Sequence, residues 1–396
     1  MTTIIRNIKG VETLVFAKTF EFEAYDQIKK LTNFEAYTDS KIRVMPDAHA
    51  GKGCTVGTTM TISDKVTPNL VGVDIGCGML TVKLKNKNIG LDKLDLAITE
   101  NVPSGQNAYD EPRSKFDFSG LRCHKHVDLA RAACSLGTLG GGNHFIEAGI
   151  LDSTGELHLI IHSGSRKLGV DICKHYQDKA FQSANEMSKV IKTTVDRLKA
   201  QGRQHDIESE LKKLKKPSAD KELAFLEGND LADYMNDMAI AQAFAMANRA
   251  AIAKIIMKTC GLAQSESFDT IHNYIDFRRM ILRKGAVSAE LGEKLLIPIN
   301  MRDGSLLCSG KGNPDWNFSA PHGAGRLMSR SKAKQSITME EFTKSMTGIH
   351  TTSVSTDTID EAPQAYKHMT EIIEAITPTA EIIGIIKPIY NFKAHQ

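Results

Sequence analysis

Strand-like runs recur through both halves of the chain with helical patterns between them, and this constrains the fold most strongly. Each run is apolar or alternating and is bounded by Gly, Asn or Asp, as buried strands are. The runs are NLVGVDI (69–75), MLTVKL (79–84), LHLIIHS (157–163), EKLLIPI (293–299) and GSLLCS (304–309). Helical patterns fill about 168–200 and 230–260, and Gly261 is a typical helix-terminating residue. No long linker separates these elements, so the sequence predicts one mixed α/β (α+β) body over residues 1–396.

The composition is that of an ordinary globular protein, with 41% hydrophobic and 24% charged residues. The net charge is only +3, from 50 basic and 47 acidic residues, so any surface that binds nucleic acid must be local. We find no run of about 20 apolar residues, and therefore expect no membrane span. The N-terminal MTTIIRNIKG has no signal-peptide pattern, and the seven cysteines have no framework spacing. These features predict a cytoplasmic protein with reduced thiols.

Most of the cysteines are expected to be small buried hydrophobes, as free cysteines commonly are. This expectation covers Cys123, Cys134, Cys173, Cys260 and Cys308.

A basic helical segment is expected at about 178–220. Within it, residues 189–216 carry nine Lys/Arg against four Asp/Glu. One interpretation is a solvated helical hairpin that turns near Gly202. The other is an arm that contacts the phosphates of a nucleic acid.

The stretch GVDIGCGM (72–79) places Asp74 and Cys77 three residues apart among three glycines. Glycine permits positive φ and lets the backbone approach another group closely. Carboxylate and thiolate are both metal ligands, so the stretch indicates a metal-binding turn.

Three histidines also lie in glycine-flanked or strand-end motifs, namely His144 in GTLGGGNHFIE, His162 in HSGSRKLG and His272 before Asn273. Taken alone, such a histidine is more often a structural residue than a ligand. Together with Asp74 and Cys77 they form a mixed set of oxygen, sulfur and nitrogen ligands, which suits Mn, Fe or Zn. Five candidates exceed the four ligands of a closed zinc site and fit two metals that share a ligand, an arrangement used in phosphoryl chemistry.

A fourth histidine, His322, lies in PHGAGRLMSR before a turn of small residues. Arg326 and Arg330 follow it, and Arg166 follows His162. Arginines and exposed glycine N–H groups bind anions, so the residues by themselves predict a metal-dependent site for phosphoryl transfer.

The order of the motifs resembles that of the RtcB-type RNA ligases, from about Val44 to Lys393. The motifs are MPDAHAGKG (45–53), GVDIGCGM, GTLGGGNHF, HSGSRKLG, HN (272–273), RKGA (283–286), HGAGR and DEAPQAYK (360–367). The resemblance implies one large domain with central mixed sheets flanked by helices. It also implies a GTP- and Mn²⁺-dependent ligase that joins an RNA 3′-phosphate or 2′,3′-cyclic phosphate to a 5′-hydroxyl, in RNA repair or tRNA splicing. A protein–histidine–GMP intermediate and guanylylation of the RNA 3′ end are part of that implied reaction.

The resemblance also implies roles for particular residues. The ligands of two Mn²⁺ ions would be Asp74, Cys77, His144, His162 and His272, with Cys77 shared by both ions. His322 would be the nucleophile that becomes guanylylated. The nucleotide pocket would comprise Asn143, Phe145, Glu147, Asn300, Ser305, His322, Gly323, Ala324, Gly325, Arg326, Tyr366 and Lys393. Asp47 and His49 would lie in the surround of the active site, without a metal assigned to them.

Two stretches depart from the pattern of the family. Residues 298–302 read PINMR where the family has a PGSMG-like stretch, and Lys393 is followed by Ala394, His395 and Gln396 instead of ending in Lys-Gly. Both stretches would adjoin the nucleotide. The sequence therefore predicts weaker or broader nucleotide use and a divergent branch of the family.

Two other functions remain open at this level. A metal-dependent RNA phosphatase or cyclic phosphodiesterase would keep the metal ligands but would not need His322 or GTP. A non-catalytic RNA-binding protein would be expected to have lost ligands, and all five are present. No sequence feature fixes an oligomeric state, and a monomer is compatible with it.

Overall fold

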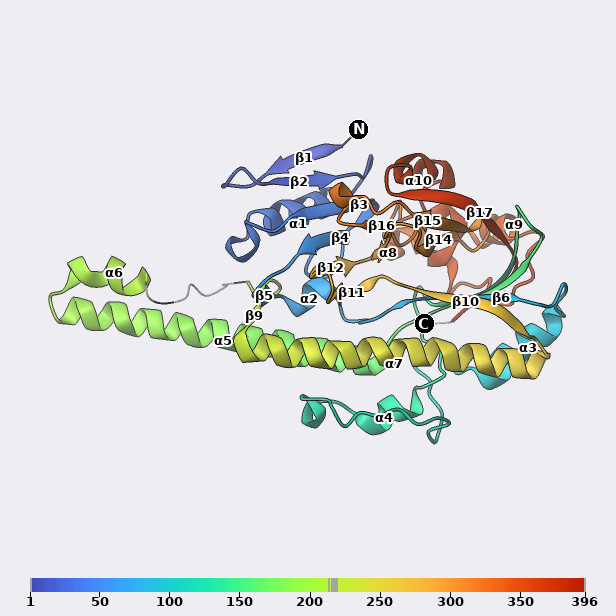
Figure 1. Ribbon diagram of the computed structural model, residues 1–396, viewed down its shortest axis with the longest axis horizontal. Coiled ribbons are helices and arrows are strands. Elements are labelled where there is room, and N and C mark those ends of the chain that lie inside the picture. Colours follow the sequence, from blue (N-terminus) through green and yellow to red (C-terminus); the bar gives the residue numbers. More distant parts are fainter. Residues whose placement is uncertain (1, 213, 215–219, 395–396) are drawn as a thin grey trace.

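Two large β-sheets and two long helices organise the chain (Figure 1). The structure, a computed structural model, describes residues 2–212, 214 and 220–394. The six-stranded sheet contains, in order, β1 (Thr3–Arg6), β2 (Glu12–Val15), β3 (Ile42–His49), β4 (Val56–Thr61), β12 (Ile281–Lys284) and β11 (Asn273–Asp276). The seven-stranded sheet contains β10 (Gln264–Ile271), β6 (Gly78–Leu84), β8 (Leu157–Ser163), β7 (Phe145–Leu151), β17 (Ala380–Lys393), β15 (Gly304–Gly310) and β14 (Lys294–Asn300).

Short elements and helices complete the fold. Two small ladders pair β13 (Ala286–Ser288) with β16 (Ser319–Pro321) and β5 (Lys65–Val66) with β9 (Leu226–Glu227). The helices are α1 (Phe22–Thr32), α2 (Pro68–Val71), α3 (Leu91–Asn101), α4 (Leu129–Cys134), α5 (Arg166–Ala200), α6 (Ile207–Lys212), α7 (Gly228–Cys260), α8 (Arg330–Ser336), α9 (Met339–Ser345) and α10 (Met369–Ile376). The predicted mixture of strands and helices is confirmed.

The seven-stranded sheet is antiparallel throughout and curls on itself. Its two edge strands meet where the Leu296 N–H of β14 donates to Thr270 Oγ1 of β10, at 3.3 Å. Met79, Ile160 and Ile386 come from strands that are not all neighbours, yet they pack in one apolar cluster. These side chains therefore fill the inside of the curl, which leaves its ends for polar groups.

The six-stranded sheet is mixed, because β2 pairs with β3 in parallel while its other ladders are antiparallel. One face of it buries Val15, Val44 and Met60 in the largest apolar cluster, to which α1 and α5 also contribute.

The helices α5 and α7 lie side by side along one face of the molecule, and α7 packs against β6 and β8 (Figure 1). Both helical predictions are confirmed, and Gly261 ends α7 with φ at 70°. Within the described chain, α7 is the one helix long and apolar enough by length and composition to cross a membrane. Asp237, Asn248 and Arg249 are buried on α7 and bond to loops of the body, which is how a core helix packs.

The predicted strand at NLVGVDI is wrong. Residues Pro68–Val71 form the short helix α2, followed by a turn that ends where β6 begins at Gly78. Pro68 occupies the first turn of α2, where its missing N–H costs no hydrogen bond. Periodicity alone cannot distinguish a short buried strand from a short buried helix. Here the helix α2 buries Leu70 and Val71 as fully as a strand would have done.

The basic segment forms the predicted helical hairpin. The end of α5 and the short α6 project beyond the sheets, with the chain turning at Gly202, whose φ is 71° (Figure 1). Leu198, near the end of α5, is buried. Lys213, Lys215 and Lys216 lie outside the described residues, and contact of the segment with phosphates stays a prediction.

The expectation for the cysteines holds for Cys123, Cys173 and Cys308, which are buried. It is wrong for Cys134 and Cys260, which are partly exposed. Each of these two is the last residue of a helix, and Cys260 packs only at the margin of an apolar cluster.

Replacement of Arg249 is expected to destabilise the fold strongly. Its guanidinium is fully buried and pairs with Asp269 through bonds of 2.9 and 2.6 Å. Removing one partner of a buried pair leaves an uncompensated charge, so Arg249→Met should lower the free energy of unfolding by about 3–5 kcal/mol, measured by urea denaturation. Arg278→Met is the control, because its side chain is 74% exposed, and it should change stability by less than about 0.5 kcal/mol.

Candidate active site

The turn that follows α2 delivers Asp74 and Cys77 to one end of the curled sheet. Gly76 has φ at 72° and its N–H donates to the Asn273 carbonyl at 2.7 Å. The Arg249 guanidinium donates to the carbonyls of Gly76 and Ser163, both at 2.8 Å. One side chain therefore joins the metal-binding turn to the end of β8.

Four candidate ligands come from one end of four adjacent strands, β10, β6, β8 and β7. His272 directly follows β10, Cys77 directly precedes β6, His162 lies near the end of β8, and His144 directly precedes β7. The antiparallel register places Gly78 opposite both Ile271 and Ser163. This register brings residues that are up to 195 positions apart, from 77 to 272, into contact.

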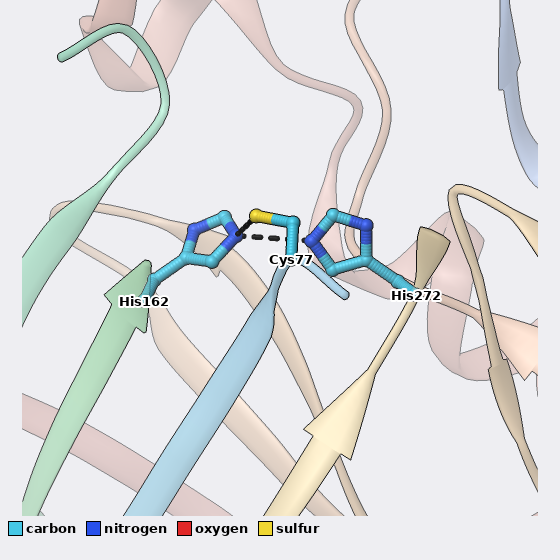
Figure 2. Close-up of side chains that lie close together, drawn as sticks. All are labelled: Cys77, His162 and His272. Atoms are coloured by element: carbon cyan, nitrogen blue, oxygen red, sulfur yellow. Dashed lines mark hydrogen bonds between the residues drawn. The ribbon is translucent and has the colours of Figure 1, made fainter. Parts of the chain in front are cut away.

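Figure 2 shows Cys77 between His162 and His272, with the polar atoms of the three side chains pointing toward one another. Cys77 Sγ lies 3.4 Å from His162 Nε2, and the Nε2 atoms of His162 and His272 are 3.0 Å apart. On the other side, Cys77 Sγ is 3.4 Å from His144 Nε2, which is 3.0 Å from Asp74 Oδ2.

The five side chains form two overlapping groups of three, each with ligand atoms within 4.8 Å of one another. One group is Cys77, His162 and His272, and the other is Asp74, Cys77 and His144. Cys77 belongs to both. Each group could therefore hold a metal ion, and two ions that share the sulfur stay a prediction.

The protonation of these groups favours cation binding. The ring N–H at His162 Nδ1 donates to the Asn143 carbonyl at 3.1 Å, which directs the lone pair at Nε2 into the cluster. Burial lowers the pKa of His162 and of His272 well below the usual range, so both rings are neutral ligands. Burial and the nearby Asp74 raise the pKa of the Cys77 thiol, so a thiolate there requires a bound cation. The donor set fits a metal.

Asp74 is held ionised. Burial alone would raise its pKa, but the hydrogen bond and charge of His144 outweigh burial and lower the pKa to about 2. Ser165 N–H also donates to Asp74 Oδ1 at 3.1 Å. A Cβ at Gly164 would lie 2.1 Å from that oxygen, so only glycine allows the HSGSR loop to approach the carboxylate this closely.

His322 lies beside the metal-capable cluster but outside it. Its ring centroid is 4.8 Å from that of His272. The Nδ1–H donates to Asp47 Oδ2 at 2.6 Å, and the His322 backbone N–H donates to the same oxygen at 3.1 Å. Asp47 is fully buried. This pairing fixes the ring and leaves the Nε2 lone pair available as a nucleophile.

A cavity next to His322 gathers almost all of the residues predicted for the nucleotide pocket. Its wall includes Asn143, Phe145, Glu147, Asn300, His322, Gly323, Ala324, Gly325, Arg326, Tyr366 and Lys393. We call it the nucleotide cavity, after the prediction from the sequence. Burial raises the pKa of Glu147 to about 8, although Asn391 donates to one of its oxygens at 3.0 Å. The other oxygen, Oε1, has no hydrogen-bond partner among the described residues and so is available to a ligand.

Glu361 organises the basic side of the nucleotide cavity. It is an ion-pair partner of Arg326, Arg330 and Lys393, and the Tyr366 hydroxyl donates to it at 2.5 Å. Burial opposes ionisation, but these cations outweigh it and lower the pKa of Glu361 to about 2. The carboxylate therefore holds three cations in fixed positions in the cavity wall.

Three predicted pocket positions differ in their surroundings. Ser305 lies in β15 opposite Pro298, fully buried and, on the described chain, outside the wall of the cavity. The side chain of Asn300 lines the cavity but is also bonded to the turn at Arg302 and Asp303. Arg302 points to Asp303 instead, through bonds of 2.7 and 2.9 Å. His395 and Gln396 lie outside the described residues.

Sequence reasoning gave no role to Glu361 and only a general place to Asp47. Both lie inside motifs that had been recognised, MPDAHAGKG and DEAPQAYK. The signal that could have identified them is an acidic residue inside a motif, in a site whose other motifs supply arginines and histidines that need an anionic partner.

A curled sheet with a His/Cys/Asp cluster at one end, beside a cavity walled by fixed cations, is an α/β arrangement that could hold metal ions. A profile of the family described as tRNA-splicing ligase RtcB matches residues 27–122 and 116–394. The chain is 31% identical to the RNA-splicing ligase RtcB of Escherichia coli (strain K12), over 89% of this chain and 90% of that protein. It is 26% identical to the tRNA-splicing ligase RtcB of Nanoarchaeum equitans, over 88% of this chain and 86% of that protein. The chain belongs to the RtcB family.

Cys77→Ala is expected to abolish metal binding by both groups of ligands, because the sulfur is common to them. The affinity for Mn²⁺ and for Zn²⁺, measured in turn by equilibrium dialysis, should fall by about a hundredfold or more. Cys77→Ser should retain weak binding, since a hydroxyl is a poorer ligand than a thiolate. Cys308→Ala, which removes a buried cysteine within β15, should bind metal as the parent does. Normal binding by Cys77→Ala would rule out the shared ligand.

Proposed function

We propose that this protein is an RNA ligase that joins an RNA 3′-phosphate or 2′,3′-cyclic phosphate end to a 5′-hydroxyl end, with GTP as co-substrate and two Mn²⁺ ions. Membership of the RtcB family supports the ligase activity. The observation that carries the mechanism is the Asp47–His322 pair, which aims a free imidazole nitrogen at a cavity beside a metal-capable cluster.

Asp74, Cys77, His144, His162 and His272 would hold the Mn²⁺ ions, with Cys77 in both groups. Bound there, the ions would neutralise phosphate charge and lower the pKa of a water molecule that opens a cyclic phosphate.

His322 acts as the nucleophile toward GTP. Its Nε2 attacks the α-phosphorus, the N–P bond forms, and pyrophosphate leaves with the electrons of the broken P–O bond. An oxygen of the RNA 3′-phosphate then attacks the same phosphorus and takes the GMP group from the histidine. Finally the RNA 5′-hydroxyl attacks the 3′-terminal phosphorus, loses its proton, and GMP leaves. Throughout, Asp47 keeps the Nδ1–H in place.

The nucleotide cavity supplies complementary groups for GTP. Glu147 Oε1 is available to form a hydrogen bond with the polar edge of guanine, and the Phe145 ring supplies apolar surface in the wall of the cavity. Arg326, Arg330 and Lys393 would hold phosphate oxygens while Glu361 keeps them in position.

The second candidate function, a metal-dependent RNA phosphatase or cyclic phosphodiesterase without ligation, has no use for the Asp47–His322 pair. We therefore favour the ligase. We further propose that residues 1–396 form one RtcB-like domain and that the protein acts in the cytoplasm in RNA repair or tRNA splicing.

His322→Ala should bind metal normally but form no covalent adduct, because only the nucleophile is removed. Incubation with GTP labelled at the α-phosphate should label the parent protein and leave the variant unlabelled. The label should be lost in acid and kept in base, as expected for an N–P bond. His158→Ala is the control, since this buried histidine lies on β8 away from both cavity and cluster within the described residues, and it should be labelled.

The variant also tests the order of steps. An RNA prepared with a guanylylated 3′-phosphate should still be joined to a 5′-hydroxyl RNA by His322→Ala, because the task of the nucleophile is already complete. A labelled His322→Ala protein would mean that another residue is the nucleophile. Failure on the activated RNA, with metal still bound, would give His322 a further role in sealing.

Nucleotide choice is expected to be broader or weaker than in relatives with a PGSMG-like stretch. Asn300 stands in the cavity wall in place of a small residue, so it changes the hydrogen-bonding groups near the base. Adduct formation should be compared with GTP, ATP and dGTP, for the parent and for Asn300→Ser. Strong preference for GTP that is unaffected by the substitution would contradict this prediction. Arg302→Gly is the matched control, since Arg302 is turned toward Asp303.

A further inference from the structure

A second cavity shares His322, His49 and Asn143 with the nucleotide cavity and continues between other elements. Its wall also contains Asp74 and His272 of the metal-capable cluster. His322 is therefore common to two cavities. A GMP group bound to His322 from the nucleotide cavity would therefore be within reach of a ligand in the second cavity.

Lys284, from the motif RKGA, lies in the wall of this second cavity and is only 5% exposed. Its ammonium group donates to the backbone carbonyl of Asn69 at 2.9 Å and to that of Lys52. Across residues 2–212, 214 and 220–394, no carboxylate forms an ion pair with it. The thiol of Cys54 is close, but burial raises the pKa of Cys54, so the thiol is neutral and gives no counter-charge.

A buried ammonium without an opposite charge is costly, because it has lost its water and gained only neutral dipoles. The carboxylate of Asp74 in the same wall belongs to the metal-capable cluster and, among the described residues, forms no ion pair with Lys284. Lys284 therefore favours a further anion in the cavity that it faces. Lysine is a common phosphate ligand because its ammonium acts as a compact positive charge.

The backbone beside Lys284 approaches His322 directly. Gly285 has φ at 60°, and a Cβ there would lie 2.2 Å from Val56 Cγ1 and 3.2 Å from His322 Cε1. The Gly285 N–H donates to Asn273 Oδ1 at 2.9 Å, which ties this segment to the residue next to His272. The glycine of RKGA thus lets Lys284 sit in the same cavity as the nucleophile.

Lys52 adds a second cation to the wall of the cavity. It is exposed, and its side chain makes no ion pair within the part of the chain that the structure describes. Because its carbonyl accepts from Lys284, the two lysines are linked, one buried and one facing solvent. A phosphate that enters from solvent would meet Lys52 first and Lys284 further in.

We propose that this second cavity is the subsite for the 3′-terminal phosphate of the RNA, with Lys284 as its inner cation and Lys52 at its rim. The proposal rests on the proposed ligase function. The triphosphate of GTP is the other source of the same chemistry, but the nucleotide cavity already provides Arg326, Arg330 and Lys393 for it. The second cavity instead borders the metal ligands and has two lysines of its own.

The test is binding of a fluorescent oligoribonucleotide to the full chain without GTP. The same RNA is used with a 3′-phosphate and with a 3′-hydroxyl end. The parent protein should prefer the 3′-phosphate by about tenfold or more, and Lys284→Met should lose that preference. Lys284→Arg should retain part of it. In parallel, adduct formation with GTP alone is measured in Lys284→Met, as a separate readout of the nucleotide step.

Lys367→Met is the matched control. Lys367 is also buried and also donates to two backbone carbonyls, those of Thr19 and Pro46, both at 2.8 Å. On the described chain it lies outside the walls of both cavities. If Lys284 served only to hold loops together, as Lys367 does, the two variants would show the same preference for the 3′-phosphate RNA. The proposal requires the preference for a 3′-phosphate to survive in Lys367→Met and to disappear in Lys284→Met.

Lys52→Met keeps the proposal testable if Lys284→Met fails to fold, because an exposed lysine can be replaced without loss of packing. It should weaken binding of the 3′-phosphate RNA and reduce the slope of log affinity against log salt by about one unit. An unchanged slope there, or an unchanged 3′-phosphate preference in Lys284→Met, overturns the proposal. Slower adduct formation in Lys284→Met with an intact preference would assign the lysine to GTP and also overturn it.

The two proposals can fail separately. A parent protein that forms no adduct and seals no RNA would refute the ligase function. A 3′-phosphate preference that depends on Lys284 would still establish the subsite in that case. Conversely, a parent that ligates while Lys284→Met keeps the full preference would leave the function standing and remove the subsite.

Discussion

The metal-capable cluster depends on the hydrogen bonds and the ion pair that the buried guanidinium of Arg249 forms. The guanidinium pairs with Asp269 of β10 and donates to the carbonyls of Gly76 and Ser163. One side chain on α7 thereby fixes β10, the turn before β6 and the end of β8. These are the segments that carry His272, Cys77 and His162, so the distances between the ligand atoms follow from this bond set.

The cationic side chains in the two cavities beside His322 have different partners. In the nucleotide cavity, Glu361 pairs with Arg326, Arg330 and Lys393, so the cations are held even before a ligand binds. In the second cavity, Lys284 is held by carbonyls alone among the described residues. Prepaired cations position a ligand at little cost of reorganisation, whereas an uncompensated cation attracts an anion strongly. His322 thus lies between two cavities whose cations are held in different ways.

Acidic residues of the site have three distinct roles that their sequence positions do not reveal. Asp47 orients an imidazole, Asp74 belongs to the metal-capable cluster, and Glu361 holds a group of cations. The pKa of Asp74 and of Glu361 is lowered to about 2 by neighbouring groups, whereas burial raises that of Glu147 to about 8. The same carboxyl chemistry is tuned by what folds around it, and only the assembled site contains that information.

The sequence by itself determined the ligand types, the order of the motifs and most of the long elements. Metal coordination depends on the chemistry of Asp, Cys and His side chains, and helices such as Gly228–Cys260 follow from local periodicity and a terminal glycine. The tertiary structure decided what depends on contacts between distant residues. It made Pro68–Val71 a helix instead of a strand, since burial of a short apolar run is satisfied by either. It also brought Asp47 to His322 and Lys284 to the second cavity, because strand register and side-chain packing, not spacing along the chain, set which groups meet.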